Sequence, residues 1–282
     1  MTPGRLALHE IALAGVQVKA GTVFGSYDGQ GHYVSPPSGA SEFDFEQDLF
    51  GAVRLLERGQ VALLVPFVET HRTASGIQET GGGLGDVNAN VRYDFLRATE
   101  SKIVPGIAAL AGVTFPTGTA PDAPGLGPLA TGATGVGAYQ LNVGLALEQA
   151  WGPWLASLTG ILAQRFARDV SYPGAAGSPG ATIHERLALQ GTVLAALAYV
   201  LPNERALALS VAYAGEGDAT INGVESAGTA HRLITVGLSG VIPFSDLWRL
   251  QAGLTLTPPV DTFGANQPAS AGLLATLVRA WN

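Results

Sequence analysis

Strict alternation of polar and apolar residues is the feature that most limits what this chain can fold into. In the stretch GDVNANVRYDF, residues 85–95, every second residue is polar and the residues between them are mostly apolar. The polar positions are Asp86, Asn88, Asn90, Arg92 and Asp94. Successive side chains of a β-strand point to opposite sides, so this pattern predicts a strand with one polar and one apolar face. The apolar face contacts either a protein core or a lipid bilayer, and the local pattern leaves both open.

The same pattern returns in YQLNVGLALE, residues 139–148, and in RLQAGLTLT, residues 249–257. We expect about twelve strands, many of them as long as the roughly nine to eleven residues that cross a bilayer obliquely. The expected ranges are 5–27, 41–56, 61–72, 84–97, 102–117, 132–151, 154–168, 184–201, 205–214, 229–243, 248–258 and 270–281. Small residues such as Gly144 and Gly253 lie on the polar faces, where a soluble core would need bulk.

Composition excludes several classes of protein. Charged residues make up only 13% of the chain, about half the usual share for a soluble domain. The longest apolar run, VLAALAYVL at 193–201, is too short for a membrane helix, which needs about 20 residues. A net charge of -7 argues against a nucleic-acid partner, and the absence of cysteine excludes disulfides and thiolate metal sites.

The connections between the expected strands alternate in length. LERGQ, RATES, WGPW, LPNER and PFSD are short, whereas GQGHYVSPPSGAS, TAPDAPGLGPLAT and VSYPGAAGSPGAT are long. An even number of strands, with short turns on one rim and long loops on the other, is typical of an outer-membrane barrel. We therefore predict one antiparallel transmembrane β-barrel domain over residues 1–282, with short periplasmic turns, long extracellular loops and periplasmic termini. The start, MTPGRLALHE, lacks the features of a signal peptide, so the chain is either processed or retained in the cell.

The four tryptophans support the same topology. Trp151 and Trp154 flank one short turn, Trp248 follows another, and Trp281 is the penultimate residue. Indole rings favour the headgroup zone of a membrane, so we expect these four to form the periplasmic aromatic belt. The alternative is that they are core residues of a soluble barrel.

Part of the chain resembles a known family. Gly85 and Asp86 open a strand that reaches Tyr93, and the next strand ends at Phe115-Pro116-Thr117-Gly118; NVGLALEQAWGPWLASLTGILAQRF follows at 142–166. Over about 84–168 these features are similar to the outer-membrane transporter family named for the MetA pathway of phenol degradation. The resemblance implies a barrel of about twelve strands, related to fatty-acid and aromatic-hydrocarbon channels, and supplies no catalytic residues. The chain departs from the family at its end, where the terminal aromatic, Trp281, lies one place early.

Charged residues are expected to line the interior of such a barrel. In EFDFEQD, Glu42, Asp44, Glu46 and Asp48 share one face of a strand and would attract cations. The inward positions also include four arginines, Arg92, Arg165, Arg186 and Arg249. Two interpretations remain open: the acids and arginines face each other across an open path, or they pair and fill the interior.

Other chemistry finds little support. The histidines near the long loops, His32, His71, His184 and His231, match no metal-ligand spacing, so we predict no metal and no cofactor. For a lipid hydrolase, Ser239 lies too deep in its strand and Ser226 falls in a loop, so we predict no enzyme activity. The loop at 118–131 could fold inward as a constriction, which its proline and glycine residues would allow, but a solvated surface loop is the favoured expectation.

The sequence therefore predicts a bacterial outer-membrane channel for passive uptake of small molecules, hydrophobic and aromatic compounds included. Its expected partners are outer-membrane lipid and the small-molecule substrate. The alternative is a structural barrel with a plugged interior that binds another envelope protein, and a lipid hydrolase is the less favoured third reading. The substrate and the oligomeric state are left undetermined.

Overall fold

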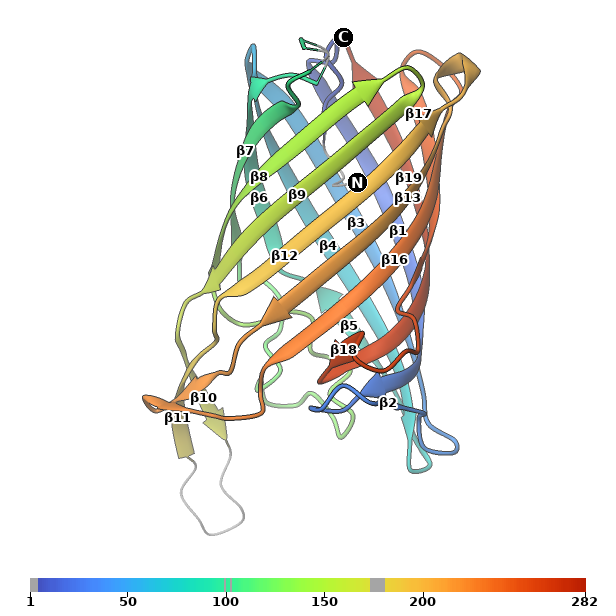
Figure 1. The fold of residues 1–282 in the computed structure, drawn as a ribbon. Helices are drawn as coiled ribbons and strands as arrows, with labels where there is room; N and C mark the ends of the chain where they lie inside the picture. The colour runs from blue at the N-terminus through green and yellow to red at the C-terminus, as the bar shows by residue number, and fades with distance from the viewer. Residues whose placement is uncertain (1–4, 99, 102, 173–180) are drawn as a thin grey trace.

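Twelve long antiparallel strands close into a single barrel (Figure 1). The computed structural model describes residues 5–98, 100–101, 103–172 and 181–282. The barrel strands are β1 (Ala12–Tyr27), β3 (Ser41–Leu56), β4 (Gly59–Ala74), β6 (Val87–Leu96), β7 (Gly106–Phe115), β8 (Gln140–Trp151), β9 (Trp154–Arg165), β12 (Gln190–Val200), β13 (Ala206–Glu216), β16 (His231–Pro243), β17 (Trp248–Leu256) and β19 (Gln267–Trp281). Each pairs with its neighbour in the chain order of this set, and the pairing of β1 with β19 closes the ring. The predicted fold class is confirmed.

Smaller elements extend the wall at one end. β2 (Tyr33–Val34) pairs with β1, β5 (Ile77–Leu84) with β4, and β18 (Gly264–Ala265) with β16. A separate four-stranded sheet contains β10 (Arg168–Tyr172), β11 (Ala181–Arg186), β14 (Thr220–Ile221) and β15 (Val224–Glu225). A 3-10 turn, η1 (Pro202–Glu204), connects β12 to β13. Among the described residues, no helix is long and apolar enough to cross a membrane.

Pro66 marks the place where β4 changes its partner. β4 pairs with β6 as far as Leu64 and with β5 from Phe67 onward. Proline has no N–H to donate, so it fits at an interruption of the ladder. The carbonyl oxygen of Pro66 still accepts the N–H of Gly85, at 2.8 Å. Gly85 lies between β5 and β6, so this bond holds the connection between them against β4.

The two rims of the barrel differ as the connection lengths predict. We call the rim with the short connections and the C-terminus the turn end, and the opposite rim the loop end (Figure 1). The turns after β3, β8, β12 and β16 lie at the turn end, and the separate sheet extends from the loop end. Residues 5–10, expected to begin the first strand, instead lie apart from the wall, which begins at Ile11, where backbone hydrogen bonds to Trp281 and Arg54 start the ladder.

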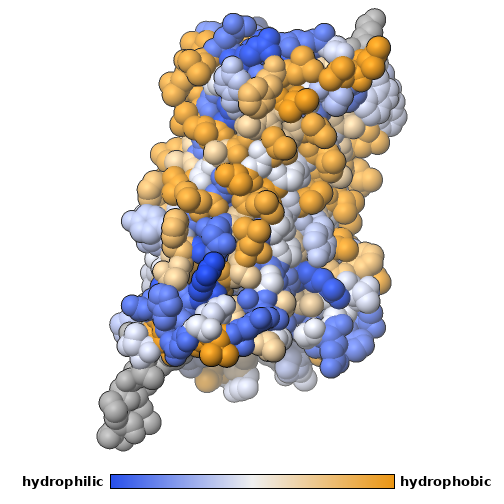
Figure 2. Space-filling view, turned by 60° about the vertical axis from the view of Figure 1, so that its left-hand side comes forward, coloured by the Kyte–Doolittle hydropathy of each residue, from blue (hydrophilic) through white to orange (hydrophobic). Residues whose placement is uncertain are grey.

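The outer surface of the barrel is apolar over most of its height. Figure 2 shows a broad hydrophobic band between two hydrophilic ends. Exposed apolar residues recur at every second position, as in Val91, Tyr93 and Phe95 of β6 and Leu141, Val143 and Leu145 of β8. A soluble barrel would gain nothing from exposing such a band, whereas lipid would cover it.

Candidate functional site: the barrel interior

The interior receives the polar face that the alternation predicts. On β6, Asn88, Asn90, Arg92 and Asp94 share the face opposite to the exposed Val91 and Phe95. Asn88 and Asn90 are joined by a hydrogen bond of 3.1 Å, and Asn88 also donates to Thr114 of β7. Arg92 contacts Asp94 at 2.8 Å and Glu148 of β8 at 3.1 Å. The inner face of β6 is therefore already hydrogen-bonded to its neighbours.

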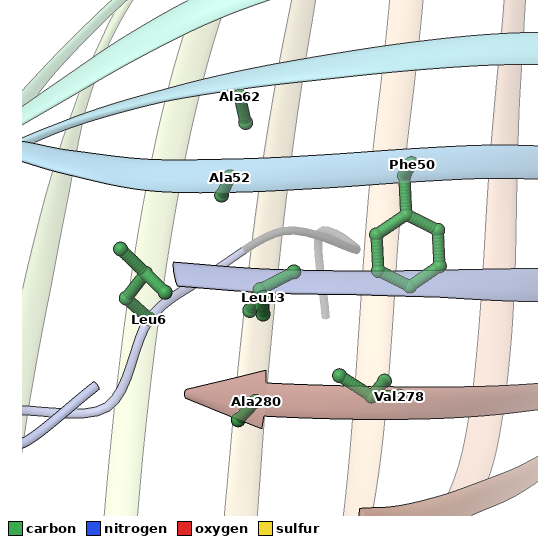
Figure 3. Close-up of a cluster of buried hydrophobic side chains, with 7 residues drawn as sticks. All are labelled: Leu6, Leu13, Phe50, Ala52, Ala62, Val278 and Ala280. Carbon is green, nitrogen blue, oxygen red and sulfur yellow. The ribbon is translucent and has the colours of Figure 1, made fainter. Parts of the chain in front are cut away.

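Residues 5–10, which we call the terminal segment, lie inside the turn end of the barrel. Leu6 is only 6% exposed and packs against inward-facing wall residues, namely Leu13, Phe50, Ala52, Ala62, Val278 and Ala280 (Figure 3). The N–H of Leu6 donates to the side-chain oxygen of Gln60 on β4, at 3.1 Å. The terminal segment thus occupies part of the interior that a strand pattern alone would leave empty.

Ion pairs hold the terminal segment in place. Arg5 pairs with Glu148 of β8, and Glu10 pairs with Arg249 of β17. Arg54 of β3 donates to the carbonyl oxygens of Ala7 and Glu10, at 2.7 and 3.0 Å. Glu10 and Glu148 are both nearly buried, so removing the arginine of either pair would leave a buried carboxylate without its partner, which is strongly destabilising. The sequence pattern did not identify Arg5, Leu6 or Glu10, because the fold of 5–10 is set by contacts distant in sequence.

The acidic strip, defined as Glu42, Asp44, Glu46 and Asp48 on β3, is partly neutralised by neighbouring strands. Lys19 of β1 contacts both Glu46 and Asp48, each at 2.8 Å. Arg72 of β4 contacts Glu42 at 2.9 Å, whereas Asp44 accepts a hydrogen bond from the Thr70 hydroxyl at 2.9 Å. Four carboxylates face two cations, so the strip keeps an excess of negative charge. Lys19 was not singled out from the sequence, although it shares the inward face of β1 with the buried Gln17.

A second polar cluster lies at the loop end, on the far side of the ring. Arg165 of β9 contacts Glu216 of β13 at 3.2 Å and donates to Gln140 of β8 at 3.1 Å. Glu216 also lies 3.5 Å from His231 of β16. The arginines thus pair with local acids and do not face the acidic strip as free charges. The acidic strip and these arginines therefore have separate partners, because Lys19 and Arg72 contact the strip while Glu10, Glu148 and Glu216 contact the arginines.

Arg186 differs from the expectation. It is the last residue of β11 in the separate sheet, outside the barrel wall, and its side chain is exposed. The segment expected as one strand from 184 to 201 breaks at Leu187–Leu189, so the inward parity assumed for Arg186 does not carry over from β12.

Residues 116–139, which we call the inner loop, contact the inner face of the wall at the loop end. Arg72 donates to the carbonyl of Leu129 at 2.9 Å, and the N–H of Leu129 donates to Glu79 of β5 at 2.6 Å. A Cβ on Gly81 of β5 would lie 2.6 Å from Thr131, so only glycine allows this approach. The expectation of a solvated surface loop is wrong, because Thr131 is buried against β5.

Asp86 anchors the inner loop. Its carboxylate accepts the N–H of Gly118 at 2.9 Å and the N–H of Val136 at 2.7 Å, so it ties both arms of the loop to the junction of β5 and β6. Asp86 therefore differs from Asn88 and Asn90, since its charge is directed at backbone amides.

We expect Asp86→Ala to loosen the inner loop by about 1.5 to 3 kcal/mol, because two charge-assisted hydrogen bonds are lost. Limited proteolysis of the folded protein would show faster cleavage within 116–139. Asp218→Ala is the matched control, since Asp218 accepts the N–H groups of Thr229 and Ala230 in another loop. Equal cleavage of the inner loop in wild type and Asp86→Ala would contradict the anchoring role.

The remaining wall of the interior is lined at mid-height by uncharged and mostly small side chains, with Leu110, Ile161, Leu194 and Leu274 as the larger inward residues. Strand registers place these residues on the inward face of the strands from β7 to β19: Gly112, Gly144, Ala146, Thr159, Thr192, Ala212, Gly237, Gly253, Thr255 and Gly272. At this height the interior is therefore two-sided, with charge on β1, β3, β4 and β6 and neutral side chains opposite. The charged residues of the opposite strands, Glu148, Arg165, Glu216 and Arg249, lie nearer the two rims. The small side chains leave more room along the barrel axis than bulky ones would.

All four tryptophans lie at the turn end and none belongs to the buried core of the described residues. Trp151 and Trp154 face each other across the β8–β9 turn, and Trp154 packs edge-on against Tyr199 with ring centres 4.9 Å apart. Trp248 stacks on Phe244, and Trp281 ends β19. Three of the four are exposed, as a membrane-facing belt would require.

The four loop-side histidines are dispersed, each beside one acid. His32 lies 3.3 Å from Asp28, His71 2.9 Å from Glu69, and His184 2.9 Å from Asp169. The amide N–H groups of His32 and Gln30 hold the pKa of the Asp28 carboxyl below its usual range. Within the part of the chain that the structure describes, no three His, Cys, Asp or Glu side chains are placed to bind a metal ion.

The fold is similar to solved outer-membrane barrels. The sequence matches no protein-family model and no curated protein. An outer-membrane channel from Pseudomonas putida F1 superposes with a TM-score of 0.78 at 17% identity, covering 99% of this chain and 98% of that one. The translocator domain of the autotransporter NalP from Neisseria meningitidis gives a TM-score of 0.56 at 11% identity, with 97% and 89% covered. At these identities the likeness shows a shared barrel fold.

Proposed function

We propose that the protein spans a bacterial outer membrane, with the turn end in the periplasm, as a channel for passive passage of small molecules. The observation that carries the proposal is the closed twelve-stranded ring with an apolar outer band and a polar, partly small-residue interior. A closed barrel leaves no unpaired strand edge, which is the requirement for strands to cross a bilayer. The likeness to the channel from P. putida supports the same interpretation.

We propose that the inward residues of the acidic strip, of β6 (Asn88, Asn90, Arg92, Asp94), and Arg165 and Arg249 line the path, and that Asp86 shapes its loop end. The neutral wall from β7 to β19 would accept apolar bodies, which supports hydrophobic and aromatic compounds as substrates. The acidic strip opposite would favour cations or hydrogen-bond donors over anions. Membership of the MetA-pathway family remains a prediction from the resemblance.

The test of the channel is single-channel recording from folded protein in a planar bilayer. Stable current steps with a preference for cations are expected. Folded, inserted protein that never conducts would reject the channel and favour the second candidate.

That second candidate is a structural or partner-binding barrel with a filled interior. It is favoured by the terminal segment and the inner loop, which occupy the interior at the turn end and the loop end. Because they lie at opposite ends of the interior, a channel needs each of them to move or to leave a gap. Current steps in the wild type would therefore count directly against a permanently filled barrel.

Neutralising the acidic strip should change ion selectivity. Replacing Glu42, Asp44, Glu46 and Asp48 by their amides removes four negative charges and leaves Lys19 and Arg72 without acidic partners. We expect the preference for cations to fall and the reversal potential in a salt gradient to move toward that of an anion-selective pore. Glu69→Gln is the control, because Glu69 is an exposed carboxylate near His71 on the outer face of β4. An unchanged reversal potential in the fourfold variant would leave the strip a purely structural role.

A further inference from the structure

Arg279 is an unusual cation on the outer surface of the barrel. It lies near the end of β19 with its guanidinium carbon 5.0 Å from the ring centre of Trp281 and 5.7 Å from that of Trp248. The side chain is exposed, and no carboxylate of the described residues forms an ion pair with it. By contrast, the interior arginines Arg92, Arg165 and Arg249 are all paired with acids. A cation that two indoles orient, and no acid neutralises, is available to an external anion.

An apolar groove of about 500 Å³ lies farther along the same outer face. Its lining includes the small residues Ala20, Gly240, Ala252 and Ala275 and the larger Leu238 and Leu273. The four residues from Arg279 to Ala275 span about 13 Å along β19, at about 3.3 Å per residue. Only the pair Leu250 and Leu277 separates the groove from the Trp248–Arg279 pair.

The spacing fits one class of ligand. With strands tilted by about 40°, 13 Å along the strand is about 10 Å along the membrane normal, within one leaflet's hydrocarbon depth of about 15 Å. A headgroup at Arg279 would therefore place the middle of its acyl chain at the groove. Guanidinium binds phosphate through two parallel hydrogen bonds, and indoles favour the headgroup level.

We propose that Arg279, Trp248, Trp281 and this groove form a binding site for an anionic glycerophospholipid, with the phosphate on Arg279 and one acyl chain in the groove. The inference rests on the proposed position of the barrel in a membrane. The anionic headgroup is preferred because Arg279 carries an uncompensated positive charge. The groove gives the site its length, so that free phosphate alone would be a poor ligand.

The test is lipid competition on the folded protein in detergent, read by native mass spectrometry. Delipidated protein receives equal amounts of phosphatidylglycerol and phosphatidylcholine with identical acyl chains. The wild type is expected to retain phosphatidylglycerol about tenfold better, and Arg279→Gln is expected to bring the ratio near one. Arg205→Gln is the matched control, since Arg205 is exposed at the same end and forms no ion pair within the described chain. Each variant is first checked for folding by its resistance to unfolding in cold SDS.

Two further measurements test whether the groove takes part in binding and whether the bound anion is a lipid or free phosphate. Ala252→Phe fills the groove and should lower phosphatidylglycerol retention with Arg279 intact, whereas millimolar inorganic phosphate should not displace the lipid. Full displacement by inorganic phosphate, an unchanged lipid preference in Arg279→Gln, or an equal loss in Arg205→Gln would overturn the proposal. The binding is measured in detergent, so failure of the barrel to insert into vesicles would count against the proposed function and not against the lipid site.

Discussion

Val91→Arg is expected to weaken the barrel in a bilayer by about 2 to 4 kcal/mol, whereas Asn90→Arg is expected to be tolerated. The two residues are adjacent on β6 but point to opposite faces, and the Val91 side chain is 47% exposed in the outer apolar band. An arginine at 91 would put a guanidinium into hydrocarbon near the middle of the strand. At 90 it would enter the polar interior, beside Gly112 of β7 and close to Asn88.

The measurement is urea unfolding of both variants in lipid vesicles, compared with the wild type. The same two variants in detergent micelles provide a control, because a micelle adapts to a surface charge more readily than a bilayer does. Equal destabilisation of the two variants in vesicles would contradict both the facing of β6 and the membrane position of the outer band.

Leu6→Ala is expected to release the terminal segment and to raise the time that the channel spends open. Truncating a buried leucine costs about 2 to 4 kcal/mol, which would favour the released segment by a factor of about thirty to several hundred. The barrel strands themselves should remain paired, because Leu6 belongs to a segment that fills the interior and is not part of the strand ladder. Single-channel recording would show longer or larger open states than the wild type.

Leu8→Ala is the matched control for the terminal segment, since Leu8 lies two residues away and is 56% exposed. Glu10→Gln provides an independent route, because it removes the carboxylate that pairs with Arg249 and should raise the open time in the same direction. Currents identical to the wild type in both Leu6→Ala and Glu10→Gln would show that the terminal segment does not limit conduction.

The barrel strands were largely predictable because their signal is local. Alternation places Val91 outside and Asn90 inside without any information from distant residues, since the pleat of a strand has a period of two. The short turns at 57–58 and 152–153 are likewise recognisable from the local sequence, as in Gly152-Pro153 beside Trp154. All twelve expected strands overlap a barrel strand of the structure.

The contents of the interior were less predictable. The inner loop is held by Arg72 of β4, Glu79 of β5 and Asp86 just before β6, all of them at least 30 residues earlier in the chain than the loop residues that they bind. Its glycines and prolines suit a surface loop and an inward loop equally well. The expected inward facing of Arg186 was wrong for a related reason. It assumed one continuous strand, whereas the chain leaves the strand after Arg186 and β12 begins only at Gln190.

The sequence by itself determined the class of fold, the number and facing of the barrel strands, and the contrast between the two rims. These depend on the period of the side chains and on the length of connections, both of which are properties of neighbouring residues. Only the tertiary structure decided that the terminal segment lies inside, that the acids pair with Lys19, Arg72 and the arginines, and that Arg279 stands between two indoles. Each of these depends on which strands the closed ring brings together, because a charge or a buried leucine is stabilised by partners that the order of the chain does not reveal.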